Sequence, residues 1–203
     1  LELSEKLDIY DDIPELLSVS LGAAETTLLN LTSSYASFVN GGKKINPTLI
    51  SRIQDRRGKT IFSLKNRKCN GCDKFINENE KLPSIENTNL RVFSEETAYQ
   101  MVSILNGTVK RGTAKKLRSL NVPLAGKTGT TNKNFDAWFI GFSSNLVIGV
   151  YIGFDNPQTL GKFETGSKAA LPIFKNFIES ALFKNDFKEF KVPENIYLTS
   201  LNY

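Results

Sequence analysis

The sequence predicts an α+β fold in which an antiparallel sheet is flanked by helices. Residues 137–142 and 146–154 alternate like strands around the turn at 143–145, which is typical of an antiparallel hairpin. Apolar residues recur at helical spacing on both sides of this hairpin, in residues 94–109 and 170–182. With 203 residues and 40% hydrophobic content, the chain is long enough to bury a core of domain size.

Composition excludes several kinds of site. The chain has no histidine, which excludes a Ser-His-Asp triad, a Cys-His pair and any histidine-ligated metal within it. A base here must be a carboxylate, or a lysine whose pKa is lowered by burial or by neighbouring positive charge. The net charge of +5 is mild and is not gathered into a basic stripe. We therefore expect no nucleic-acid partner, no metal and no cofactor.

No membrane span or signal peptide is expected in the chain. The longest apolar run, residues 146–154, has nine residues, whereas a transmembrane helix needs about 20. Residues 1–6 lack the charged and apolar succession of a signal peptide. We interpret the chain as part of a longer protein.

The N-terminal segment predicts two helices. Residues 1–20 are interpreted as the end of a helix followed by a connection. Thr26 or Thr27 can cap a second helix, whose apolar positions keep helical spacing as far as Val39. Residues 40–42, Asn-Gly-Gly, provide its stop signal, and we expect this helix to be well buried.

A hairpin and a polar insertion are expected at about residues 45–90. Residues 47–53 and 60–64 flank the turn at 55–58, which predicts two strands with a polar tip in solvent. Residues 65–89 are polar and are predicted to be irregular.

Cys69 and Cys72 form a C-x-x-C pair within that insertion. Such a pair can be a redox site, half of a zinc site or a disulfide across a tight loop. Zinc is disfavoured because the chain has no second pair and no histidine. A redox motif would open a helix, whereas residues 68–73 are predicted to lie in a loop. We do not expect the pair to be catalytic.

The C-terminal half predicts two further helices and an extended tail. Ser94 can cap the helix at 94–109, and a basic cluster follows that we interpret as a solvated face. The helix at 170–182 has Pro172 near its first turn, where a missing N–H is tolerated. From about residue 184 the chain is charged and is expected to be extended.

Residues 125–131, Ala-Gly-Lys-Thr-Gly-Thr-Thr, predict a strand that can hold a carboxylate. Strand alternation directs Lys127 and Gly129 to one face and Thr128 and Thr130 to the other. The row therefore combines a positive charge, two hydroxyls and a position where a ligand backbone can approach closely.

Two other interpretations of this stretch remain to be weighed. A phosphate-binding loop, G-x-x-x-x-G-K-[ST], would need glycine where Asn121 stands and a helix where a hairpin follows. Nucleotide binding is therefore disfavoured. Lys127 could also be an ordinary surface lysine in a turn.

The motif and its surroundings resemble the penicillin-binding transpeptidases. Lys-Thr-Gly is the third motif of that serine-enzyme family, after S-x-x-K and S-x-N. The chain is most similar to the C-terminal part of the transpeptidase domain of bifunctional class A enzymes of the 1A type. The matching stretches are residues 21–22, 40–42, 111–113, 125–132, 136–142, 150–155 and 192–196.

The resemblance implies a β-lactamase/transpeptidase-like fold and a role in peptidoglycan cross-linking. Family members attack the D-Ala-D-Ala end of a stem peptide, and β-lactams bind because they mimic that end. By resemblance, Lys127 would supply a positive field and join the proton-transfer network, and the Thr128 and Thr130 hydroxyls would bind the terminal carboxylate. The Thr130 N–H would contribute to the oxyanion hole, and Gly129 would keep the wall flat. The basic cluster could then contact acidic stem peptides instead of only solvent.

The chain also departs from the family pattern. No serine is followed by lysine three residues on, so the nucleophile of S-x-x-K is absent. We expect no S-x-N motif before Lys127 either, and we reject the triplet at 143–145 because it turns a hairpin after the lysine strand. The chain alone is therefore predicted to be inactive. A serine β-lactamase and a non-catalytic peptide-binding module remain alternatives.

Location follows from the same resemblance. Such enzymes work on the periplasmic side of the bacterial inner membrane, with a glycosyltransferase domain and an anchor upstream. Because disulfides persist outside the cytoplasm, a local Cys69–Cys72 bridge is as acceptable as two free thiols.

Overall fold

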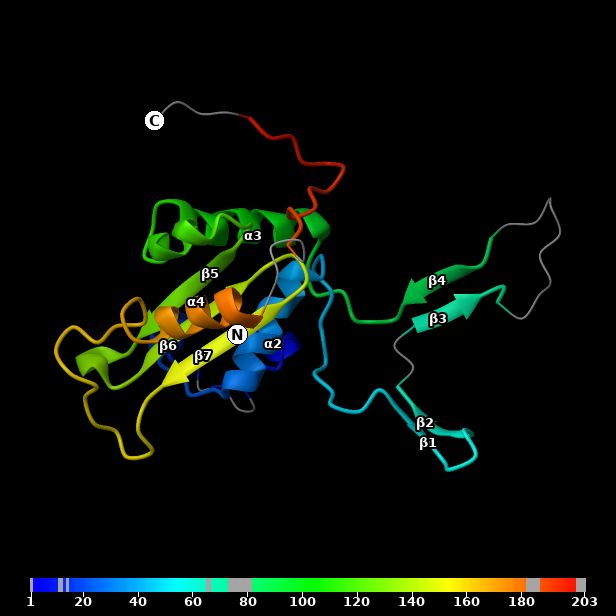
Figure 1. Cartoon of the computed structure of the whole chain (residues 1–203), viewed down its shortest axis with the longest axis horizontal. Coiled ribbons are helices and arrows are strands. Elements are labelled where there is room, and N and C mark those ends of the chain that lie inside the picture. Colours follow the sequence, from blue (N-terminus) through cyan, green and yellow to red (C-terminus); the bar gives the residue numbers. More distant parts are fainter. Residues whose placement is uncertain are drawn as a thin grey trace. The chain divides into compact units, whose positions relative to one another are not determined.

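The computed structural model describes residues 2–10, 13, 15–64, 67–72, 82–181 and 187–199. The chain divides into two compact units (Figure 1). The first combines Leu1–Ile45 with Arg91–Tyr203, and the second is Asn46–Leu90.

A three-stranded antiparallel sheet forms the centre of the first unit. Its strands follow the order β5 (Ala125–Thr130), β6 (Ala137–Phe142) and β7 (Val147–Ile152). The one-turn helix η3 (Asn132–Asn134) connects β5 to β6. The predicted lysine strand and the hairpin that follows it are therefore confirmed.

Helices cover both faces of this sheet. On one face, a β-carbon at Gly141 would collide with the Phe174 ring of α4 (Ala170–Ala181). On the other face, a β-carbon at Gly149 would collide with Thr32 of α2 (Leu28–Val39). The predicted α+β arrangement of an antiparallel sheet flanked by helices is confirmed.

The helix α3 (Glu95–Lys110) lies along the outer edge of β5 (Figure 1). Its Asn106 side chain donates to the Leu124 carbonyl at 2.7 Å, and Thr108 Oγ1 donates to the Gly126 carbonyl at 2.6 Å. Ser94 caps the helix as predicted, by accepting from the Thr97 N–H at 3.2 Å. The α3 helix thereby occupies the first half of an edge that would otherwise be open.

The prediction that α2 is well buried is wrong in detail, and the apolar positions of α4 are only partly buried. The α2 helix begins after its predicted cap Thr27, but only Ser34 and Ser37 are buried. The larger residues Tyr35, Phe38 and Val39 are only partly buried, although they pack against the core. In α4, Ile173 and Phe177 are half exposed because the buried face is rotated toward Leu171, Phe174 and Ile178. The predicted helix position 182 lies outside the described residues.

Shorter elements complete the first unit. The chain begins with α1 (Glu2–Lys6) and the 3-10 helix η1 (Leu17–Leu21), and the 3-10 helix η2 (Lys115–Leu120) follows α3. Residues 187–199 contain neither helix nor strand, yet this tail is not simply solvated. Phe187 packs against the core cluster that includes Phe174 of α4, and the Phe190 ring lies 5.9 Å from that of Phe142.

The second unit contains two small antiparallel sheets. One pairs β1 (Arg52–Gln54) with β2 (Thr60–Ser63), which confirms the predicted hairpin. The other pairs β3 (Arg67–Asn70) with β4 (Ser84–Asn87), so the prediction that residues 65–89 are irregular is wrong. Local pattern does not reveal this pairing, because the partners are separated along the chain and the strands lack apolar alternation.

Cys69 lies on β3 opposite Ile85, and not in the predicted loop. A disulfide joins it to Cys72, with the two Cα atoms 5.8 Å apart, a usual separation for bonded cysteines. Across the described ranges, no helix has the length and apolar character needed to cross a membrane.

Candidate active-site wall

The β5 strand presents its four motif residues on two faces. Lys127 is paired with Ile140 and Thr128 with Phe139, so Lys127 shares the α2 face and Thr128 the α4 face. Lys127 and Thr130 are exposed, whereas Thr128 is only 9% exposed. The predicted alternation along the strand is therefore present, but the two hydroxyls differ in access.

The second half of β5 directs main-chain groups toward the outer edge of the sheet. The Leu124 and Gly126 carbonyls point outward to α3, while the Thr131 N–H points inward to the Asp136 carbonyl at 3.2 Å. By alternation, the N–H and C=O groups of Thr128 and Thr130 also point outward. The strand thus offers an edge on which an extended peptide could pair.

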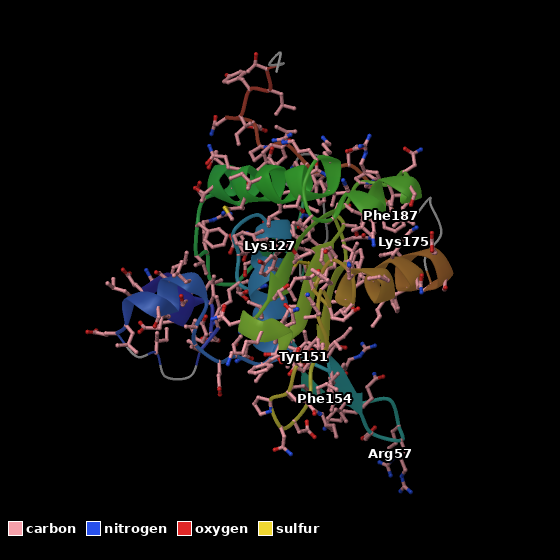
Figure 2. All side chains as sticks on the ribbon, turned by 90° about the vertical axis from the view of Figure 1, so that its left-hand side faces the viewer. Arg57, Lys127, Tyr151, Phe154, Lys175 and Phe187 are labelled. Atoms are coloured by element: carbon pink, nitrogen blue, oxygen red, sulfur yellow. A yellow bond between two sulfur atoms is a disulfide. The ribbon has the colours of Figure 1, made fainter. Side chains whose placement is uncertain are left out.

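Lys127 carries the positive charge of this wall (Figure 2). Its ammonium donates to the Thr128 carbonyl at 2.6 Å, which folds the side chain back over the strand edge. Within the described ranges, Lys127 takes part in no ion pair. Its charge is therefore not neutralised there by a carboxylate.

Two other segments contact the wall hydroxyls. Thr113, in the turn between α3 and η2, has its Oγ1 2.9 Å from Thr128 Oγ1. The Gly166 N–H, in the connection from β7 to α4, donates to Thr130 Oγ1 at 3.0 Å. Residues 111–113 are one of the stretches that match the family pattern, whereas nothing in the local sequence indicated Gly166.

Close packing explains the glycines beside the wall. A β-carbon at Gly166 would lie 2.4 Å from the Trp138 carbonyl oxygen and 2.5 Å from that of Gly129. The same connection is tied to η3, because the Leu160 N–H donates to the Asn134 carbonyl at 2.8 Å. The connection is thus fixed against the end of β5 by main-chain contacts.

An acid–phenol pair lies at the end of the hairpin. Tyr151 donates its hydroxyl to Asp136 Oδ1 at 3.0 Å, and its ring centroid lies 4.6 Å from that of Trp138. The hydrogen bond to Asp136 raises the pKa of Tyr151, with a smaller contribution from burial. Cross-strand pairing of Trp138 with Tyr151 brings these groups together, which the sequence showed only as two adjacent strands.

The expectation that no S-x-N triplet precedes Lys127 is wrong, because residues 119–121 form one. Ser119 lies in the last turn of η2, where its hydroxyl donates to the Lys116 carbonyl at 3.1 Å, and Asn121 caps that helix in a left-handed conformation. The triplet therefore closes η2. The triplet at 143–145 forms the hairpin turn, as expected, and the Ser143 N–H donates to the Leu146 carbonyl at 2.9 Å.

The basic cluster surrounds the end of α3 and η2. All its members are exposed: Lys110, Arg111, Lys115, Lys116 and Arg118. Among the residues that the structure describes, no group of acidic or cysteine side chains is arranged to hold a metal ion.

Comparisons with known proteins agree with this geometry. The model of the penicillin binding protein transpeptidase domain matches residues 14–179. Penicillin-binding protein 1A of Rickettsia bellii is 37% identical over 203 residues, covering 99% of this chain and 26% of that protein. The chain therefore spans about a quarter of the length of this relative.

Solved structures confirm the expected transpeptidase-like fold. Penicillin-binding protein 1A from Haemophilus influenzae superposes with a TM-score of 0.71 at 29% identity, over 95% of this chain and 32% of that one. The PonA1 protein from Mycobacterium tuberculosis in complex with penicillin V has a TM-score of 0.68 at 17% identity, over 95% and 52% of the two chains, and supports the fold alone. On this evidence, the chain belongs to the penicillin-binding protein transpeptidase domain family.

Proposed function

We propose that this chain supplies one wall of the active site of a serine-type D-Ala-D-Ala transpeptidase that cross-links peptidoglycan. One observation carries the proposal: the outward-facing edge at Thr128 and Thr130 lies beside the charge of Lys127, which takes part in no ion pair among the described residues. A peptide that ends in a carboxylate fits this combination, because its main chain can pair along the edge while its end reaches the ammonium and hydroxyls.

Transpeptidation proceeds in two steps, acylation of the serine and transfer of the acyl group. A serine hydroxyl attacks the carbonyl of the penultimate D-alanine, the peptide C–N bond breaks, and D-alanine leaves with a proton. The resulting ester is then attacked by an amine of a second stem peptide, which forms the cross-link and restores the serine. A β-lactam stops at the first step, because its amide is opened within a ring and the leaving group stays attached.

Lys127 acts through its charge on the substrate carboxylate. At about 4 Å and an effective dielectric constant of about 20, a charge pair is worth about 4 kcal/mol. Part of this is offset by desolvation of both groups, so loss of the ammonium is expected to slow acylation by about a hundredfold.

Thr130 contributes a main-chain donor where negative charge develops. Its N–H points out of the sheet edge, the direction that an oxyanion hole requires, and such a donor is usually worth about 3 kcal/mol. The second donor would be the N–H of the nucleophile itself. Because no serine in this sequence stands in S-x-x-K, the nucleophile is proposed to lie upstream, and this chain alone is proposed to be inactive.

The wider setting follows as part of the same proposal. The substrates are peptidoglycan stem peptides, the inhibitors are β-lactams, and the site faces the periplasmic side of the inner membrane. The anchor and a glycosyltransferase domain are proposed for the upstream part of the same polypeptide. The room for them is consistent with the relative, of which this chain covers only 26%.

Labelling with a fluorescent penicillin tests this proposal. The 203-residue chain, an upstream-extended protein and its Lys127→Ala variant are incubated with the probe and separated on a denaturing gel. The extended protein should be labelled, and Lys127→Ala should lower the rate by about a hundredfold. Lys59→Ala, which removes an exposed lysine between β1 and β2, is the matched control and should leave the rate unchanged.

Other outcomes would contradict the proposal in different ways. Specific labelling of the short chain would place a nucleophile within these 203 residues. No labelling of the extended protein would favour a non-catalytic peptide-binding module. Rapid hydrolysis of the penicillin, without a persistent covalent product, would favour a serine β-lactamase.

A further inference from the structure

The two hydroxyls of the wall are each held from outside the strand. Thr128 meets the Thr113 hydroxyl at 2.9 Å, and Thr130 accepts the Gly166 N–H at 3.0 Å. Their partners come from opposite directions along the chain, 15 residues before Thr128 and 36 residues after Thr130. The sheet itself supplies neither contact.

The direction of each hydroxyl hydrogen follows from its partner. A hydroxyl has one hydrogen to donate and two lone pairs that accept. The Gly166 N–H can only donate, so it occupies a lone pair of Thr130 Oγ1 and leaves the Thr130 hydrogen for another acceptor. Thr128 needs a similar partner more strongly, because it is only 9% exposed and has little access to water.

We propose that Thr113 is a positioning residue for carboxylate recognition at this wall. Thr113 donates its hydrogen to Thr128 Oγ1, so the Thr128 hydroxyl keeps its own hydrogen for the ligand carboxylate. The Gly166 N–H plays the same part for the Thr130 hydroxyl. Thr113 itself touches no reacting atom. The inference rests on the proposed function and adds a determinant of its selectivity.

The backbone around Thr113 is suited to such a role. The N–H groups of Gly112 and Ala114 both donate to the Thr108 carbonyl at 3.0 Å. A β-carbon at Gly112 would lie 2.8 Å from Thr108 Cα, so the turn is packed tightly against the end of α3. Ala114 is fully buried, whereas Thr113 is exposed. The turn therefore fixes Thr113 in place without using its side chain for core packing.

The test compares two ligands that differ only at the carboxylate. Acylation of the upstream-extended protein is measured with a penicillin and with its methyl ester, each in competition with the fluorescent probe. Thr113→Val removes the hydroxyl and keeps the shape, and should lower the rate for the acid about tenfold while leaving the rate for the ester unchanged. Thr113→Ser restores the hydroxyl and should restore the ratio of the two rates.

A matched control comes from the same region. Thr108 Oγ1 also donates to β5, at 2.6 Å to the Gly126 carbonyl, but it does not touch a wall hydroxyl. Thr108→Val should therefore leave the ratio of acid to ester rates as in the parent protein. In a Thr128→Val background, Thr113→Val should have no further effect on that ratio, because Thr113 acts through Thr128.

Two results would overturn the inference. Equal loss of both rates in Thr113→Val, or no loss of either, would show that Thr113 does not act on the carboxylate. An effect that persists unchanged in the Thr128→Val background would do the same. If the parent protein does not react with the penicillin, the proposed function itself fails. This failure is distinct from failure of the Thr113 inference, because it is seen with the parent protein before any variant is made.

Discussion

Two glycines on the same strand should respond differently to alanine. A β-carbon at Gly126 would lie 2.6 Å from the Ile140 carbonyl oxygen and 2.8 Å from Phe139 Cζ. The backbone oxygen cannot move unless β5 and β6 separate. A β-carbon at Gly129 would lie 3.1 Å from Trp138 Cβ, which requires a shift of only a few tenths of an ångström.

The two costs can be estimated from these contacts. Overpacking of this kind costs about 1–3 kcal/mol, and alanine recovers about 0.4–1 kcal/mol by restricting the unfolded chain. Gly126→Ala should therefore lower the free energy of unfolding by about 1–2 kcal/mol. Gly129→Ala should stay within about 1 kcal/mol of the parent protein, while its added methyl group hinders a ligand at the wall.

Thermal unfolding and penicillin acylation of the upstream-extended protein separate the two effects. Gly126→Ala should lower the midpoint of the transpeptidase-domain transition by about 2–8 °C. Gly129→Ala should unfold within a few degrees of the parent but acylate about tenfold more slowly or worse. A Gly126→Ala protein as stable as the parent, or a Gly129→Ala protein that is equally reactive, would refute the reasoning.

Three further outcomes are expected. The hydrogen bond to Asp136 raises the pKa of Tyr151, so the folded state holds this proton more tightly than the unfolded state does. The resulting stability is fully present below the ordinary tyrosine pKa of about 10 and is lost as the pH rises above it. Above about pH 10, chemical denaturation should therefore show that the stability of Tyr151→Phe falls less than that of the parent. Asn106→Ala removes the side chain that donates to the Leu124 carbonyl at 2.7 Å, just before β5. The free energy of unfolding should fall by about 1–3 kcal/mol in the same assay. An unchanged value would contradict that contact. The disulfide between Cys69 and Cys72 closes a very short loop, so its reduction should lower local stability by at most about 2 kcal/mol. Hydrogen exchange in β3 and β4 should become faster, and penicillin labelling should be unchanged.

Elements with a local signature could be predicted from the sequence. Ser94 and Thr27 cap their helices as expected. An N-cap is predictable because it depends only on a side-chain oxygen and a backbone N–H in the first turn of the same helix. The turn at 143–145 and the alternation around it likewise predicted the antiparallel pairing of β6 with β7. The two-face arrangement of Lys127 and Thr128 followed from the period of a strand.

Features that depend on distant partners could not be predicted in this way. The pairing of Cys69 with Ile85 joins two polar segments across a long connection, so no periodic pattern marks them as strands. The Gly166 N–H is a main-chain group, which carries no side-chain signal at all. Thr108 looked like one more polar position on a helix, although it holds the edge of β5. Tertiary packing decided each of these cases.

The position of a covalently bound penicillin on the upstream-extended protein tests the central claim most directly. We predict that a crystal structure of that acyl-enzyme shows the ligand carboxylate within hydrogen-bonding distance of the Thr128 and Thr130 hydroxyls. The acyl carbonyl oxygen should accept from the Thr130 N–H, with the ammonium of Lys127 nearby. A bound penicillin whose carboxylate is held by other residues, with the outer edge of β5 unoccupied, would contradict the account.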